Sequence, residues 1–109
     1  MNIQELKNLL KEKGFKEESQ DTGVKYSLTD HNVELVCYIE PNIEIEFISL
    51  YKWDQNDVKG TYNISVRDFT ITKDSVLTLF RKTKNNMPKQ IGEAINVHTE
   101  IDKVLERIF

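Results

Sequence analysis

The chain has 109 residues, 39% hydrophobic and 30% charged, with a net charge of −3, which fits one globular domain and excludes the composition class of disordered chains. The acidic balance disfavours non-specific nucleic-acid binding, which depends on Lys and Arg. The single cysteine excludes an intramolecular disulfide, and the chain shows no signal-peptide pattern or long apolar run, so we expect a cytoplasmic protein that does not act at a membrane.

Residues 2–13 are predicted to form an amphipathic helix, because apolar side chains recur there every three or four residues. Asn2 and Glu5 have the spacing of a capping box, in which each side chain accepts from the other residue's backbone N–H. Gly14 suits the left-handed position after the helix. Residues 16–23 contain no apolar side chain and are interpreted as a loop or a frayed strand end.

Four strands are predicted to follow as an antiparallel meander. The first covers residues 24–29, and the next two form a hairpin over residues 33–53 with its turn at Glu40–Asn42. Residues 54–60 are interpreted as a polar loop. Residues 61–72 are predicted to be the fourth strand, with a bulge or bend near Arg67 and Asp68 where the alternation shifts.

The two faces of the hairpin are expected to differ, because side chains alternate between the faces of a strand. The odd-numbered residues from Val33 to Phe47 are mostly aliphatic or aromatic and are predicted to face the core. The opposite face combines four glutamates with an apolar patch: Glu34, Glu40, Glu44 and Glu46 with Val36, Tyr38, Ile48 and Leu50. The pattern favours a helix that covers this patch over an exposed contact surface.

Two helices are predicted in the C-terminal part. The first begins near Lys73 and ends near Lys84, although residues 76–80 also fit a short strand. The second is a long helix from Pro88 to Ile108, with an alternative break at Asn96. Its apolar residues follow near-heptad spacing, which suits either a homodimer seam or packing within one chain: Ile91, Ala94, His98, Ile101, Leu105 and Ile108. The predicted fold is therefore α+β, with an N-terminal helix, a four-stranded antiparallel meander and two C-terminal helices packed on the sheet.

Catalytic and metal-binding patterns are weak. Residues 54–60 resemble a calcium loop in composition, but Val58 and Lys59 occupy positions that need an oxygen ligand and a glycine. His31, His98 and Cys37 provide too few ligands for a structural zinc site, and a Cys37–His98 nucleophile pair is disfavoured because Cys37 lies in mid-strand. We therefore expect no enzyme, no metal and no cofactor, while acid–base catalysis by the hairpin glutamates stays the weakest alternative.

The function that the sequence favours is binding or regulation through a protein–protein surface. Aromatic residues are common in interface hot spots, and acidic surfaces attract basic partners. The predicted contact residues are Glu34, Tyr38, Glu44, Glu46, Leu50, Lys52, Trp53 and Asp54. The composition suits a phage or mobile-element accessory protein that inhibits a host nucleic-acid-handling complex. The alternative is a nucleic-acid-binding regulator that uses the basic region from Lys73 to Lys89, which also contains Arg81, Lys82 and Lys84.

Overall fold

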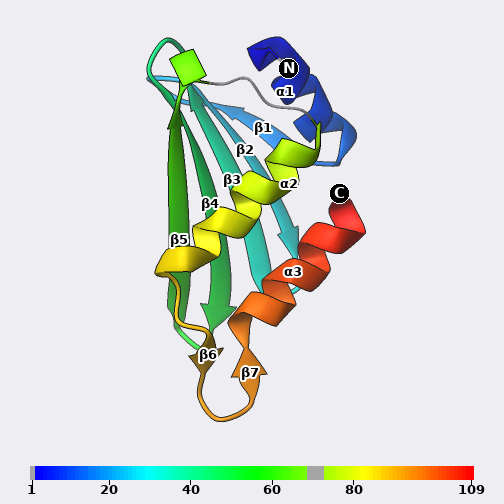
Figure 1. The fold of residues 1–109 in the computed structure, drawn as a ribbon, viewed down its shortest axis with the longest axis vertical. Coiled ribbons are helices and arrows are strands. Elements are labelled where there is room, and N and C mark those ends of the chain that lie inside the picture. The colour runs from blue at the N-terminus through cyan, green and yellow to red at the C-terminus, as the bar shows by residue number, and fades with distance from the viewer. Residues whose placement is uncertain (1, 69–72) are drawn as a thin grey trace.

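A five-stranded antiparallel sheet and the α-helices that pack on one of its faces make up the fold (Figure 1). The computed structural model describes residues 2–68 and 73–109. The strands follow one another in the sheet in chain order, as a meander. They are β1 Lys16–Ser19, β2 Val24–Asp30, β3 Val33–Glu40, β4 Glu44–Trp53 and β5 Asn56–Ser65. The α+β class is therefore confirmed, with five strands instead of the predicted four.

The other elements of the described residues are helices, short 3₁₀ turns and a small hairpin. The α-helices are α1 Ile3–Glu12, α2 Lys73–Lys82 and α3 Val97–Ile108. The 3₁₀ turns are η1 Val66–Asp68 and η2 Thr83–Asn86. The hairpin is formed by β6 Gln90–Ile91 and β7 Ile95–Asn96, and it projects beyond the end of the main sheet (Figure 1).

The N-terminal helix begins as predicted. The Glu5 backbone N–H donates to Asn2 Oδ1 at 2.8 Å, and the Asn2 N–H donates to Glu5 Oε1 at 3.4 Å. Gly14 follows the helix with a φ of +96°, in the left-handed region that glycine enters without strain. The capping box and the glycine therefore set the two ends of α1.

Residues 16–23 were interpreted as a loop or a frayed strand end, and the structure shows that Lys16–Ser19 form strand β1. All four of its side chains are exposed, so it lacks the apolar alternation on which the prediction depended. The strand is held by its backbone ladder with β2 instead. Glu17 adds side-chain bonds, because it accepts from the Tyr26 hydroxyl at 2.5 Å and lies 3.1 Å from Lys11 Nζ. The Tyr26 bond and Lys11 lower the pKa of this carboxyl.

Strand β5 corrects the predicted loop at residues 54–60. The connection is a two-residue turn, and β5 starts at Asn56, directly opposite Trp53. Asp54 accommodates the turn with a φ of +54°, a conformation that Asp adopts more readily than most residues. The predicted strand 61–72 therefore began too late. The strand ends at Ser65 and η1 follows, so the shift in alternation near Arg67 and Asp68 marks the end of β5 and not a bulge within a strand. The part of that prediction on residues 69–72 lies outside the described residues.

The C-terminal part confirms α2 as a helix and corrects the long helix after it. Residues 90–96 form the β6–β7 hairpin, in which Gly92 has a φ of +63°. Helix α3 starts after Asn96, whose Oδ1 accepts from the Thr99 N–H at 3.1 Å. The break at Asn96, which was the alternative prediction, is therefore correct, although a hairpin and not a helix precedes it.

One hydrophobic core lies between the helices and the sheet. The core face of the sheet carries the odd-numbered residues of β3 and β4, as predicted, and Leu6 of α1, Phe80 of α2 and Ile101 of α3 join the same cluster. The prediction of a covering helix on the other face is wrong, because α1, α2 and α3 all pack on this one side (Figure 1). Ile101 and Leu105 of the predicted dimer seam are fully buried in this intrachain core.

Glycine at position 60 allows η2 to lie directly against β5. A Cβ atom there would lie 2.0 Å from the Thr83 carbonyl oxygen, so no other residue fits without a shift of the backbone. The Thr83 hydroxyl is hydrogen-bonded to Ser49 Oγ at 2.7 Å and to the Phe80 carbonyl oxygen at 2.5 Å. These contacts fasten the end of α2 to the sheet.

Candidate functional site

The sheet face that the described helices leave uncovered is the candidate site, and we call it the outer face. Paired residues of antiparallel strands share a face, so the register places its members. Across β3 and β4, Tyr38 pairs with Glu46, Val36 with Ile48, and Glu34 with Leu50. Lys52 of β4 lies further along the same face and pairs with Asp57 of β5. The structure thus brings together six of the eight predicted contact residues: Glu34, Tyr38, Glu44, Glu46, Leu50 and Lys52.

An apolar strip runs diagonally across the centre of the outer face. It consists of Val36, Tyr38, Ile48 and Leu50. Val36 is only 3% exposed, and it does not belong to the hydrophobic cluster between the sheet and the helices. The other three side chains are half-buried. The Tyr38 hydroxyl is hydrogen-bonded to the Thr22 hydroxyl, which fixes the ring at the edge of the strip.

Uncompensated carboxylates border this strip. Glu40 and Glu44 face each other directly across β3 and β4, and Glu46 follows on the same side. Among the described residues, no cation lies within ion-pair distance of Glu34, Glu40, Glu44 or Glu46. Like charges directly opposite in a sheet are destabilising. Repulsion between these carboxylates therefore lowers the stability of the fold, and a cation bound between them would reduce the repulsion.

Trp53 and Asp54 do not extend the outer face. Trp53 lies at the last position of β4 and, like the other odd-numbered residues of that strand, points to the core side of the sheet. Its side chain is 39% exposed there. Asp54 lies in the turn that follows. Ile43, at the opposite end of β4, is 57% exposed and was not among the predicted contact residues. The alternation predicted that Ile43 would face the core, and the structure corrects this, because Ile43 lies in the turn before β4 and beside the Glu40–Glu44 pair.

The structure places the sulfur of Cys37 in the core and the imidazole of His98 beside a backbone carbonyl group. Cys37 is fully buried between Tyr26 and Phe47 on the neighbouring strands, and burial raises the pKa of its thiol. His98 Nε2 lies 3.2 Å from the Met87 carbonyl oxygen. The described residues contain no group of His, Cys, Asp and Glu side chains that is suited to a metal ion.

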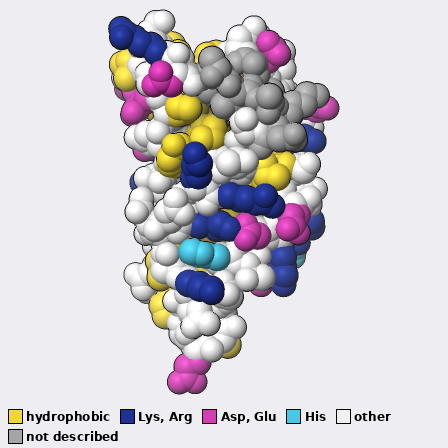
Figure 2. All heavy atoms as spheres, viewed as in Figure 1, with side chains coloured by type: hydrophobic (Ala, Val, Ile, Leu, Met, Phe, Trp, Pro, Cys, Tyr) yellow, Lys and Arg dark blue, Asp and Glu magenta, His cyan; other side chains and the backbone are white. Residues whose placement is uncertain are grey.

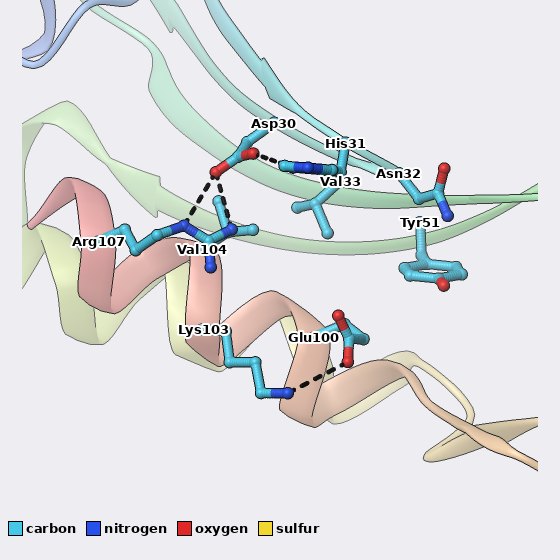
Figure 3. A pocket seen from close by; sticks show the side chains of 9 residues that line it. All are labelled: Asp30, His31, Asn32, Val33, Tyr51, Glu100, Lys103, Val104 and Arg107. Atoms are coloured by element: carbon cyan, nitrogen blue, oxygen red, sulfur yellow. Dashed lines mark hydrogen bonds and ion pairs between the residues drawn. The ribbon is translucent and has the colours of Figure 1, made fainter.

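A pocket of about 300 Å³ lies between α3 and the β2–β3 turn, and the sequence did not reveal it (Figure 3). Arg107 reaches from α3 to Asp30 Oδ2 with Nη2 at 2.9 Å, while His31 Nδ1 lies 2.5 Å from the other carboxylate oxygen. The Arg107 bond, followed by the His31 bond, lowers the pKa of Asp30. Lys103 pairs with Glu100 at 3.5 Å. Arg107 and Lys103 thus each lie beside a carboxylate, so their positive charges are already paired within the pocket.

The basic region from Lys73 to Lys89 lies on the helix side of the molecule, where Lys and Arg side chains form a band with acidic side chains beside it (Figure 2). Lys84 Nζ lies 2.5 Å from Asp102 Oδ1, and Arg81 contacts the same carboxylate at 3.8 Å. Lys82 Nζ lies 5.1 Å from the centre of the Tyr62 ring. Intrachain contacts thus already hold three of the cations proposed to bind nucleic acid.

The comparisons add no functional information. No family model, curated protein or solved structure shows significant similarity to this chain. In the part of the chain that the structure describes, none of the helices has the length and apolar character needed to cross a lipid bilayer.

Proposed function

We propose that this chain is a non-enzymatic binding domain whose outer face docks on a basic protein surface. The observation that carries the proposal is the apolar strip bordered by glutamates without cation partners, on a sheet face that no described helix covers. The apolar side chains supply area to bury, and the carboxylates supply attraction and orientation. The Glu40–Glu44 pair gains most, because a lysine or arginine between the two carboxylates removes their mutual repulsion.

The expected class of partner follows from this charge. Proteins that handle nucleic acids present Lys and Arg to phosphate groups, so their binding surfaces match an acidic face. A domain that occupies such a surface excludes the nucleic acid and acts as an inhibitor. This is the accessory-protein function that the composition suggested, and the glutamates of the outer face support it through their charge.

Charge reversal on the outer face tests the proposal. The variant Glu44→Lys/Glu46→Lys is used as bait in a cell lysate beside the wild type and a matched control, Glu12→Lys/Glu93→Lys, which changes the net charge equally at exposed sites away from the outer face. We expect basic proteins to bind both the wild type and the control in low salt and to dissociate from them in high salt. The same proteins should not bind the outer-face variant. Retention of the same proteins by the outer-face variant would show that another surface binds them.

Nucleic-acid binding through the basic region from Lys73 to Lys89 is the second candidate, because no ion pair among the described residues involves its Lys82 or Lys89. A fluorescence-anisotropy titration with a labelled duplex distinguishes the two functions. The first proposal predicts no binding at low salt. Salt-dependent binding that Lys82→Glu/Lys89→Glu abolishes would favour the second. Catalysis is not proposed, since the glutamates lie on a sheet face that no described helix covers, whereas acid–base catalysis needs a carboxyl group held against an enclosed substrate.

A further inference from the structure

The edge of the sheet at β5 presents a row of backbone groups that face away from β4. The two-residue turn after Trp53 makes Trp53 and Asn56 a hydrogen-bonded pair, and hydrogen-bonded pairs then alternate with non-bonded ones along the ladder. The Lys52 N–H agrees with this alternation, because it donates to the Asn32 carbonyl oxygen on the other side of β4, at 2.7 Å. The residues whose backbone groups point to the free edge are Asp57, Lys59, Thr61, Asn63 and Ser65. No backbone hydrogen bond within the described ranges reaches these groups.

The two edges of the sheet differ in length and in chemistry. β1 has four residues, three of them charged, and short charged edges resist pairing with other strands. β5 has ten residues, with the uncharged Thr61 at the centre of its outward row. On the helix side of β5, Val58, Tyr62 and Ile64 are half-buried against the core. β5 is therefore the edge that suits pairing with a further strand.

We propose that β5 pairs with β5 of a second copy of this chain, antiparallel, about a two-fold axis at Thr61. In this register the side chains match along the whole row. Lys59 faces Asn63 of the second copy, and Asp57 faces Ser65 of the second copy. On the helix side, Val58 faces Ile64 of the second copy. No two like charges meet, and aliphatic side chains meet each other, which is the complementarity that a symmetric interface needs.

The strength of the contact comes from the backbone. Each hydrogen-bonded pair of an antiparallel ladder contributes two bonds, so the five outward residues of each copy give about ten hydrogen bonds, as many as a typical protein interface carries. Hydrogen-bonded partners also share a face, so the two outer faces lie on the same side of one continuous sheet. The dimer would therefore present two binding faces together. This inference does not depend on what those faces bind.

Light scattering over a range of concentrations tests the dimer with two matched variants. Thr61→Lys places two ammonium groups opposite each other at the axis, whereas Thr29→Lys makes the same change on the inner strand β2 of the same face. We expect the mass of two chains for the wild type and for Thr29→Lys, and a dissociation constant at least about tenfold higher for Thr61→Lys. A one-chain mass for the wild type at millimolar concentration would overturn the proposal, as would a dimer that Thr61→Lys leaves unchanged. Circular dichroism confirms that each variant is folded.

A cross-link tests the register itself. The Cα atoms of a hydrogen-bonded antiparallel pair lie about 5.5 Å apart, within the range that a disulfide spans. We expect Thr61→Cys to form a dimer on a non-reducing gel after mild oxidation, because each new thiol faces its own equivalent. Asn63→Cys faces Lys59 of the second copy and should not cross-link, and Cys37 is buried in both variants. Equal cross-linking of the two variants, or none with Thr61→Cys, would refute the register.

Discussion

Replacement of Gly60 by alanine measures how tightly η2 lies against the sheet. The added Cβ atom would lie 2.0 Å from the Thr83 carbonyl oxygen and 2.6 Å from Met87 Cγ, and separations under 3.0 Å essentially never occur. The methionine side chain can rotate away, but the carbonyl belongs to the backbone. The 3₁₀ turn must therefore move by about 1 Å, because a close-packed interior leaves no room for the methyl group.

The cost of this movement can be worked out from the contacts that it disturbs. Overpacking of a core costs about 1–3 kcal/mol, and a strained or broken Thr83–Ser49 hydrogen bond in a buried position costs about 1–3 kcal/mol more. Alanine also restricts the unfolded chain, which returns about 0.4–1 kcal/mol. The free energy of unfolding should therefore fall by about 3 kcal/mol, which is a large part of the stability of a small domain.

Urea denaturation followed by circular dichroism gives this free energy directly. Gly92→Ala is the control, because Gly92 has a φ of +63° but nothing within 4 Å of its added Cβ atom. It should cost only the backbone strain of a left-handed residue, about 1–2 kcal/mol. If Gly60→Ala is no more destabilising than Gly92→Ala, η2 does not lie against β5 as described.

Three further variants test single interactions. Asn96→Ala removes the cap of α3 and should lower the free energy of unfolding by about 1 kcal/mol in urea titrations, and Asn96→Asp should preserve it; equal losses would exclude the capping role. Asp30→Asn removes a carboxylate whose pKa the Arg107 and His31 bonds lower, so the wild type should be more stable than this variant at pH 7. Urea titrations at a series of pH values should show this advantage decrease as the pH falls through the lowered pKa of Asp30; an advantage that does not change with pH would contradict the linkage. Glu40→Lys removes the repulsion between Glu40 and Glu44, so it should raise the free energy of unfolding by about 0.2–1 kcal/mol and weaken binding of a basic partner. Thermal unfolding and the lysate assay measure these two effects. A lower midpoint of unfolding would show that the pair is not repulsive.

The elements that local patterns control could be predicted from the sequence. The capping box of Asn2 and Glu5 involves only neighbours in the chain, and the alternation in β3 and β4 follows from one buried face. For the same reason the six outer-face residues could be placed together before any coordinates were known. Trp53 and Asp54 were predicted as a second contact surface at the end of the hairpin, and Trp53 has the core-face alternation that the sequence indicated.

The remaining elements depend on strand pairing or tertiary contacts that no run of apolar residues signals. β1 has no apolar side chain to signal a strand, and its order comes from pairing with β2. The spacing of Ile91, Ile95 and His98 fits a helix, yet the hairpin forms because Ile91 pairs with Ile95 across Gly92. The pocket beside Asp30 joins residues 77 positions apart in the chain, so only the folded structure brings Arg107 to it. The uncovered outer face likewise became evident only when all the described helices were found on the other side.

The one-sided arrangement of the helices separates folding from recognition in this molecule. Core residues of β3 and β4 alternate with outer-face residues that, except for Val36, are half-buried or exposed, so these outer positions can change while the core stays fixed. Simultaneous randomisation of Glu34, Tyr38, Glu46, Ile48 and Leu50 should therefore yield a library whose members mostly remain folded. From such a library, binders to targets of quite different chemistry could be selected on the same small framework.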